Sequence, residues 1–148
     1  MKNKFYTKKE MSEHSGLTPR TVDLYTNIDL IFPEVANPTG RGTTRKYSNK
    51  NLAELMVAKK LTDNRVPLKE IKEIFDLLTE KKQRNRLDPY GEWGWRESNL
   101  SARLYIYRHE DEILDVFIEG RRPRIEPKKY DSVLEINIER IFEYFEEG

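Results

Sequence analysis

Residues 16–30 read GLTPRTVDLYTNIDL, and this stretch predicts the fold of the first half of the chain. Gly16 suits the left-handed backbone position that follows a helix end. Thr18 followed by Pro19 is typical of a helix start, because threonine caps the first N–H groups and proline lacks one. We therefore expect a helix from Pro19 to about residue 28, entered through a tight turn at Gly16.

The flanking segments extend this helix into a larger motif. Thr7 and Glu10 have the spacing of a capping box, which predicts a helix over residues 7–15. Proline and glycine residues exclude a helix further along, so we expect a hairpin with strands at 34–36 and 43–47. Two short helices followed by a hairpin are the order of a winged helix-turn-helix.

Two longer helices follow the expected hairpin. Ser48 suits the cap of a helix that runs to about residue 64, because apolar residues recur there with helical spacing. Val66 and Pro67 begin another helix, whose apolar stripe comprises Leu68, Ile71, Ile74, Phe75 and Leu78. The run 79–86 is wholly polar, and we expect it to end as a linker.

The apolar period changes from 3.6 to 2 after the turn at residues 88–91. Alternating apolar residues predict three strands, at residues 102–109, 113–119 and 134–138. Helical spacing returns from Glu139. We therefore predict an α+β chain with a winged helix-turn-helix domain at 1–87 and a second module at 88–148, a three-stranded antiparallel sheet with a C-terminal helix.

The composition excludes several classes of protein. The 148 residues include no Cys, which excludes disulfides, thiolate zinc sites and a cysteine nucleophile. No apolar stretch approaches the roughly 20 residues of a membrane helix, and no secretory signal is visible, so we expect a cytoplasmic protein without a membrane partner. No phosphate-binding loop or catalytic constellation is present, so we predict no enzyme activity, no cofactor and no metal site.

The net charge of +1 hides an asymmetry between the two halves. Residues 1–87 hold 18 Lys and Arg against 11 Asp and Glu, and residues 88–148 hold 9 against 15. A basic first half favours a nucleic-acid contact. The major groove admits one helix, whose N-terminal residues reach base edges. The candidate DNA contacts are therefore Thr18, Arg20, Thr21 and Asp23 in the recognition helix and Arg41, Arg45 and Lys46 in the wing.

Several spaced stretches give the first half a resemblance to a known family. Residues 16–25, followed by Ile28-Asp29-Leu30, resemble the recognition-helix signature of MerR-type transcriptional regulators, Gly-Val-Ser-x-Arg-Thr-Leu-Arg-x-Tyr and then Ile-Gly-Leu. The wing of that family is similar to Gly40-Arg41-Gly42 and Arg45-Lys46-Tyr47-Ser48. Its third and fourth helices are matched at Leu52, Leu55 and 68–71. The resemblance covers about residues 4–78.

The resemblance implies a homodimer that binds specific double-stranded DNA and regulates transcription, with RNA polymerase or another protein as a further partner. It places at the DNA the side chains of Arg20, Thr21, Tyr25, Arg45 and Lys46. Lys60 occupies a position where the family often has a basic residue near the DNA backbone. Tyr25 as a core aromatic and Lys60 as a plain surface lysine are equal alternatives.

Three residues depart from the family pattern. Asp23 replaces an Arg, so we expect it to accept from a cytosine amino group or to pair with a neighbouring Arg. Asp29 and Arg65 replace glycines. At the Asp29 position the glycine is expected to have a positive φ, which Asp tolerates better than most residues do. Residues 79–101 leave little room for the family's long coiled-coil helix, so a dimer contact must lie elsewhere or the chain is a monomer. Without Cys, any effector is sensed differently from the family's thiol-based metal and redox sensing.

The aromatic residues Trp93, Trp95, Tyr105 and Tyr107 are candidates for a ligand-binding wall. The alternative for the two tryptophans is a structural plug between the halves or between subunits. The face that carries the two tyrosines can equally be solvated or paired with a partner sheet. A function of another class is also open, namely a protein-interaction adaptor that uses the winged helix-turn-helix fold without reading DNA.

Overall fold

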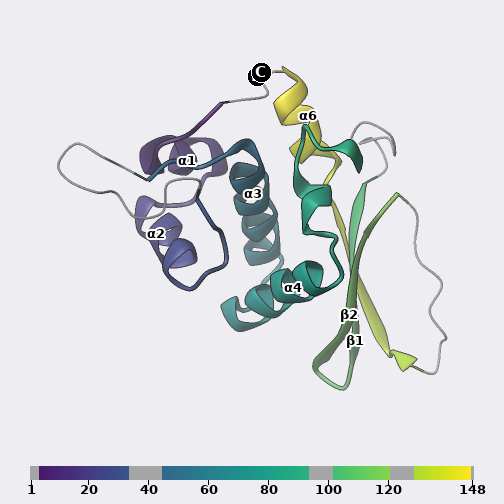
Figure 1. The fold of residues 1–148 in the computed structure, drawn as a ribbon. Coiled ribbons are helices and arrows are strands. Elements are labelled where there is room, and N and C mark those ends of the chain that lie inside the picture. Colours follow the sequence, from purple (N-terminus) through teal and green to yellow (C-terminus); the bar gives the residue numbers. More distant parts are fainter. Residues whose placement is uncertain (1–3, 34–44, 94–101, 121–128, 148) are drawn as a thin grey trace.

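The computed structural model describes residues 4–33, 45–93, 102–120 and 129–147. Its elements are α1 (Lys8–Ser15), α2 (Pro19–Asn27), α3 (Asn49–Asp63), α4 (Leu68–Glu80), the 3-10 helix η1 (Arg84–Leu87), β1 (Arg103–His109), β2 (Glu112–Glu119), β3 (Ser132–Asn137) and α6 (Glu139–Glu147). Figure 1 shows the helical layer on one side and the sheet on the other, with α4 and the segment after it between them. This arrangement confirms the predicted α+β fold.

The first helices begin and end where their capping residues predict. The Thr7 side chain accepts from the backbone N–H of Glu10 at 3.2 Å, and the Glu10 carboxylate accepts from the backbone N–H of Thr7 at 3.0 Å. Gly16 ends α1 with φ 80°, the left-handed conformation that glycine adopts without a Cβ clash. These contacts confirm the capping box and the glycine turn, and they set the angle at which α2 leaves α1.

Two non-glycine residues adopt positive φ at the positions where the family resemblance has glycine. Asp29 has φ 60° directly after α2, and Arg65 has φ 63° between α3 and α4. Left-handed backbone costs an L-residue about 1–2 kcal/mol, and Asp is among the residues that adopt it most often. The turns therefore keep the geometry that glycine would give, although each carries a side chain.

The sheet has the order β2-β1-β3, with both pairs antiparallel. β1 and β2 are joined by a tight turn in which Glu110 (φ 50°) and Asp111 (φ 66°) both have positive φ, as the hairpin twist requires. The register shifts between Tyr107 and Arg108, which leaves Leu114 as an extra residue on β2. The alternation of apolar residues in the predicted strand 113–119 puts Leu114 on the face of Val116 and Ile118. Leu114 is 45% exposed instead of buried with them, and the bulge is the reason.

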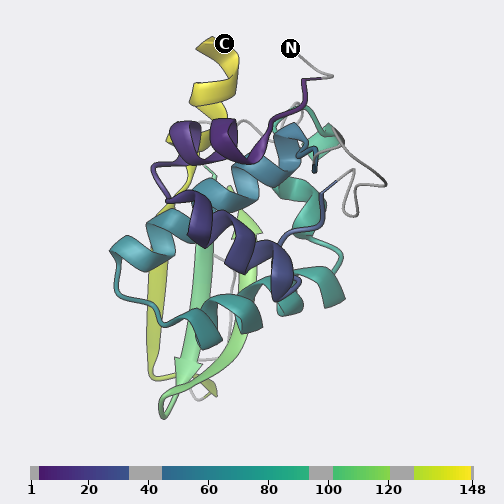
Figure 2. The ribbon, with the colours of Figure 1, turned by 90° about the vertical axis from the view of Figure 1, so that its left-hand side faces the viewer.

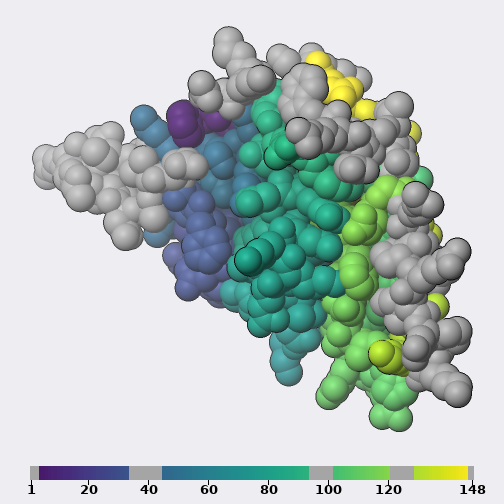
Figure 3. All heavy atoms as spheres, turned by 45° about the vertical axis from the view of Figure 1, so that its right-hand side comes forward, coloured from purple at the N-terminus to yellow at the C-terminus, as the bar shows by residue number. Residues whose placement is uncertain are grey.

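A single hydrophobic core joins the helices to one face of the sheet. The core residues contributed by the sheet and α6 include Leu104, Ile106, Val116, Ile118, Ile136, Ile141, Phe142 and Phe145. They pack in the same cluster as the apolar residues of α1 to α4. Figure 3 shows the atoms of α4 and the segment after it directly beside those of β2. Residues before and after position 87 share this core. The predicted domain boundary at residue 87 stays a prediction.

Polar contacts reinforce the seam between α4 and the sheet. Lys81 donates to the Asp115 carboxylate and to the Val116 carbonyl, both at 2.9 Å. The Ile118 N–H donates to the side-chain carbonyl of Gln83 at 2.9 Å, and Arg86 contacts Glu119 at 2.8 Å. The prediction that 79–86 is a linker is therefore wrong. The side chains of Lys81, Gln83 and Arg86 bind the edge of β2, a role that a polar pattern does not reveal.

Candidate nucleic-acid interface

Helix α2 lies on the side of the molecule opposite the sheet. Figure 2 places α1 and α2 in the foreground with the sheet behind them. Val22 is fully buried and Tyr25 is 4% exposed, so these two side chains hold one face of α2 against the core. The N-terminal turn points the other way, with Thr18 and Arg20 exposed. The helix therefore presents its first turn to solvent, as a major-groove reading helix must.

The start of α2 is held in place by its own residues. The Thr18 hydroxyl accepts from the Thr21 backbone N–H at 3.1 Å, and the two threonine hydroxyls lie 2.9 Å apart. Arg20 has no hydrogen bond or ion pair to any residue that the structure describes. A fixed backbone with an unpaired guanidinium beside it suits an incoming base edge or phosphate, because Arg forms bidentate contacts with both.

Asp23 joins two cations from different parts of the chain. Its carboxylate lies 3.0 Å from the Lys8 ammonium on α1 and 3.7 Å from the Arg45 guanidinium at the end of the predicted wing. These pairs agree with the expectation that Asp23 pairs with a neighbouring Arg. The carboxylate thereby ties α1, α2 and the end of the wing together, and it also removes part of their positive charge.

The end of the wing is anchored by Tyr47. Its backbone forms an isolated antiparallel bridge with Tyr6, with N–H···O distances of 2.8 and 2.9 Å. The Tyr47 side chain is fully buried, and its hydroxyl lies 2.8 Å from the hydroxyl of Thr26 on α2. Lys46, the preceding residue, is exposed. The predicted hairpin strands at 34–36 and 43–44 and the candidate contact Arg41 lie outside the described residues.

The structure brings the end of α3 close to the recognition helix. The Tyr25 hydroxyl lies 3.4 Å from the hydroxyl of Thr62. Tyr25 is therefore a packing residue of α2 in this structure, although its hydroxyl lies at a polar edge. Lys60 is half-buried on α3 without an ion-pair partner among the described residues, whereas the neighbouring Lys59 pairs with Asp63 at 2.6 Å.

Of the aromatic residues singled out from the sequence, the three that the structure describes do not meet in one place. Trp93 packs against Phe142 of α6, with ring centroids 6.3 Å apart, and the Arg86 guanidinium lies 5.5 Å from its ring. Tyr105 and Tyr107 lie on the opposite face of the sheet and are buried, and burial raises the pKa of Tyr105. Trp95 lies outside the described residues. No common wall of these four side chains is formed by the part of the chain that is described.

Sequence reasoning missed a buried polar cluster between the first turns of α3 and the start of η1. Arg84 is 8% exposed and contacts the carboxylate of Glu54, which is 2% exposed. Asn51 donates to Glu54 at 3.2 Å and to the Phe32 carbonyl at 3.1 Å. In the sequence Glu54 lies within a run of apolar residues of α3. A carboxylate in such a run indicates a buried partner, and this was the signal that could have revealed the cluster.

Neither a membrane span nor a metal cluster is found in the described parts of the chain. Among those residues no helix has the length and apolar character needed to cross a membrane. Within the same residues no group of three or more His, Cys, Asp or Glu side chains is placed to hold a metal ion.

Comparison with known proteins gives one consistent result for the first half. Residues 6–78 match the family model described as MerR HTH family regulatory protein. The chain is also similar to uncharacterized HTH-type transcriptional regulators of Mycobacterium bovis and of two strains of Mycobacterium tuberculosis. Each is 30% identical over 67 residues, which is 45% of this chain and 30% of the relative. The match thus spans less than a third of those relatives.

Proposed function

We propose that this chain, whose residues 6–78 form a MerR-family helix-turn-helix domain, binds a specific double-stranded DNA sequence and regulates transcription there. The observation that carries the proposal is the exposed first turn of α2, capped by Thr18, with Arg20 beside it unpaired among the residues that the structure describes. A rigid helix start with a cation that has no internal partner is what base reading in the major groove requires.

The residues around α2 divide into two proposed roles. Thr18, Arg20 and Thr21 reach base edges, because they occupy the first turn of the helix. The proposed contacts to the DNA backbone are Arg41, Arg45, Lys46 and Lys60, with the Tyr25 hydroxyl as a further donor. Asp23 acts indirectly by holding Lys8 and Arg45 in place. Binding to bases sets the preferred sequence, and binding to phosphates supplies most of the affinity.

The second module, residues 88–148, is proposed to make the contacts that turn DNA binding into regulation. These are a second copy of the chain, RNA polymerase or another protein. The net charge of this module is −6, from 9 Lys and Arg against 15 Asp and Glu, so its surface does not compete for DNA. The chain contains no Cys, so the proposed regulation does not use thiol-based metal or redox sensing.

Selection from a random duplex pool, followed by titration at several salt concentrations, tests the proposal. We expect one enriched sequence and an affinity that falls steeply with salt, since each phosphate contact releases about one counterion. The absence of both enrichment and salt-dependent binding at low salt would reject DNA reading. That outcome would favour the adaptor function, in which the same fold binds a protein.

A further inference from the structure

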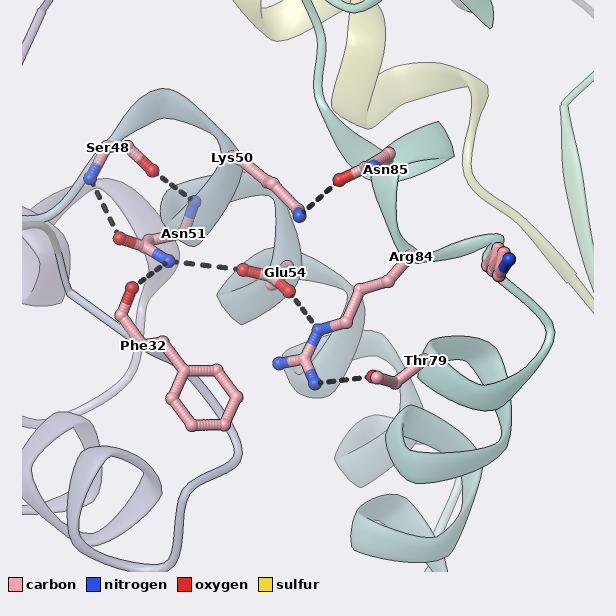
Figure 4. Close-up of a pocket in the computed structure, with 9 residues that line it drawn as sticks. Phe32, Ser48, Lys50, Asn51, Glu54, Thr79, Arg84 and Asn85 are labelled. Atoms are coloured by element: carbon pink, nitrogen blue, oxygen red, sulfur yellow. Dashed lines mark hydrogen bonds and ion pairs between the residues drawn. The ribbon is translucent and has the colours of Figure 1, made fainter.

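A pocket of about 480 Å³ lies where three segments meet: the chain after α2, the first turns of α3, and the connection from α4 to η1 (Figure 4). Small-molecule sites commonly have volumes of about 300–1,000 Å³. The side chains that the argument needs are Phe32, Lys50, Asn51, Glu54, Lys82 and Arg84. None of them belongs to the proposed DNA contacts, so this pocket is a separate feature of the molecule.

The floor of the pocket is rigid and its charges are balanced. The Arg84 guanidinium contacts the Glu54 carboxylate through Nε and donates to the Thr79 hydroxyl at 3.2 Å. Asn51 donates to the same carboxylate from the other side. A buried ion pair whose remaining atoms are hydrogen-bonded keeps one geometry, because any rearrangement leaves a buried charge unpaired.

The mouth of the pocket carries uncompensated positive charge beside an aromatic ring. The Lys50 ammonium donates to the neutral amide oxygen of Asn85 at 2.6 Å, and Lys82 has no partner among the described residues. Glu54 is the one carboxylate among the described lining residues, and Arg84 already balances it. The Phe32 ring is 60% exposed and the Arg84 guanidinium lies 5.4 Å from its centroid. An exposed ring and two lysines that line the same pocket offer one apolar surface and one anion-binding surface.

We propose that this pocket binds a small aromatic anion, a flat ring that carries a carboxylate or a phosphate. The ring of the ligand packs on Phe32, as offset aromatic pairs do. Its anionic group is neutralised by the ammonium groups of Lys50 and Lys82. A neutral ring gains the stacking contact alone, and inorganic phosphate gains the charge contact alone, so the pocket selects for both features in one molecule.

The same floor residues hold the segment that connects α2 to the wing. Arg84 donates through Nη2 to the Leu30 carbonyl, and Asn51 donates to the Phe32 carbonyl at 3.1 Å. Any ligand that shifts Phe32 therefore acts on the exit of the recognition helix. Occupancy of the pocket changes DNA affinity by this route, a second step that rests on the proposed function.

Binding is tested on the full chain by NMR titration without DNA. The probes are salicylate and adenosine 5′-monophosphate, their uncharged counterparts salicylamide and adenosine, and inorganic phosphate. We expect saturable shifts at Phe32, Lys50 and Asn85 with at least one of the charged aromatic probes. The preference between the two reports whether a carboxylate or a phosphate is recognised. Absence of saturable shifts with both charged probes, or equal affinity for charged and uncharged partners, would overturn the proposal.

Two variants locate the site. Lys82→Gln and Phe32→Ala change exposed side chains, so both are expected to fold, and each should weaken probe binding about fivefold or more. Lys69→Gln, an exposed lysine at the start of α4 outside the pocket, is the matched control and should leave binding unchanged. Unchanged affinity in both pocket variants would place the binding elsewhere and reject the site.

The coupling step is measured separately, as duplex affinity with and without the saturating probe. A change that Lys82→Gln abolishes supports coupling, whereas an unchanged affinity rejects the coupling and leaves the binding result standing. If no duplex binds, the proposed function fails. The NMR titration without DNA still tests whether the pocket binds an aromatic anion.

Discussion

The cations of the recognition face and those of the sheet are used in different ways. Arg20 on α2 and Lys46 at the end of the predicted wing have no ion-pair partner among the described residues. The two arginines of β1 are both paired: Arg108 contacts Glu70 of α4 at 2.7 and 2.9 Å, and Arg103 contacts Glu139 of α6 at 2.6 Å. Arg20 and Lys46 are available to an external anion. Arg103 and Arg108 instead form the ion pairs that join β1 to α6 and to α4.

This difference separates affinity from stability. An exposed, unpaired cation contributes little to folding, because water solvates it in both the folded and the unfolded state. A partly buried pair contributes through hydrogen bonds to charged groups. Substitutions of unpaired cations are therefore expected to change DNA binding, and substitutions of paired ones to change unfolding.

The largest effect is expected at Arg84, the buried paired cation of the helical layer. Arg84→Leu leaves the Glu54 carboxylate buried without a cation, with only the Asn51 amide still donating to it among the described residues, and should lower the free energy of unfolding by about 3–5 kcal/mol. Urea denaturation followed by circular dichroism measures the change. The exposed Arg20→Leu variant is the control and should cost less than about 0.5 kcal/mol.

A double variant tests whether the pairing itself is responsible. Combining Glu54→Leu with Arg84→Leu removes both charges, so most of the lost stability should return. A double variant as unstable as Arg84→Leu alone would show that shape, not charge pairing, sets the stability at this position.

The next effect is expected in sequence discrimination. Arg20→Ala should reduce the free-energy difference between the preferred duplex and a mismatched one by about 1–3 kcal/mol, because a base contact is lost. Fluorescence anisotropy with the two duplexes measures this difference. An unchanged preferred sequence would show that Arg20 does not read bases. It would contradict the assignment of unpaired cations to DNA binding.

A smaller effect, dependent on pH, is expected at the seam between α4 and the sheet. The hydrogen bonds from Arg108 lower the pKa of Glu70, so the ionised form stabilises the fold. This contribution is complete above the unfolded-state pKa of about 4.3 and is lost as the pH falls through the lower folded-state value. Glu70→Gln should therefore cost about 1–2 kcal/mol at pH 7 and almost nothing at pH 2–3.

The exposed Glu80 on the same helix supplies the control for this measurement. Glu80→Gln should change the free energy of unfolding at pH 7 by less than about 0.5 kcal/mol. A constant difference between Glu70→Gln and the wild type across the whole pH range would mean that the charge of Glu70 is not what holds β1 to α4.

The smallest effect is expected from a single phosphate contact. Lys46→Gln should weaken binding to all duplexes alike and lower the salt slope by about one, since one counterion fewer is released. The matched control is Lys129→Gln, an exposed lysine of the second module. Equal losses in the two variants would show that overall charge, not position on the recognition face, determines DNA affinity.

Local signals predicted most of the elements, and long-range polar contacts were not predictable from them. The capping residues Thr7, Thr18 and Ser48 each cap the helix that the sequence assigns to them. The bulge that exposes Leu114 depends on strand register, which the alternation of apolar residues does not encode.

At the candidate site, too, local features were predictable from the sequence and long-range contacts were not. The sequence predicts that α2 is the reading helix, which stays a prediction, and the structure leaves Arg20 exposed at the start of that helix. It did not identify Arg84, whose partners lie 30 and 54 positions away in the chain and contribute a carboxylate and a backbone carbonyl. A polar run looks the same whether its side chains meet water or a distant carboxylate.

The side chains that cover β2 limit how copies of this molecule can join. Lys81, Gln83 and Arg86 already occupy backbone groups on the outer edge of that strand. An edge whose hydrogen-bonding groups are occupied cannot accept a strand from another chain. Among the described strands, growth of the sheet is then confined to the β3 side, and joining two copies edge to edge there uses the last edge that these strands offer. Strand addition would stop at a pair and could not propagate into a fibre.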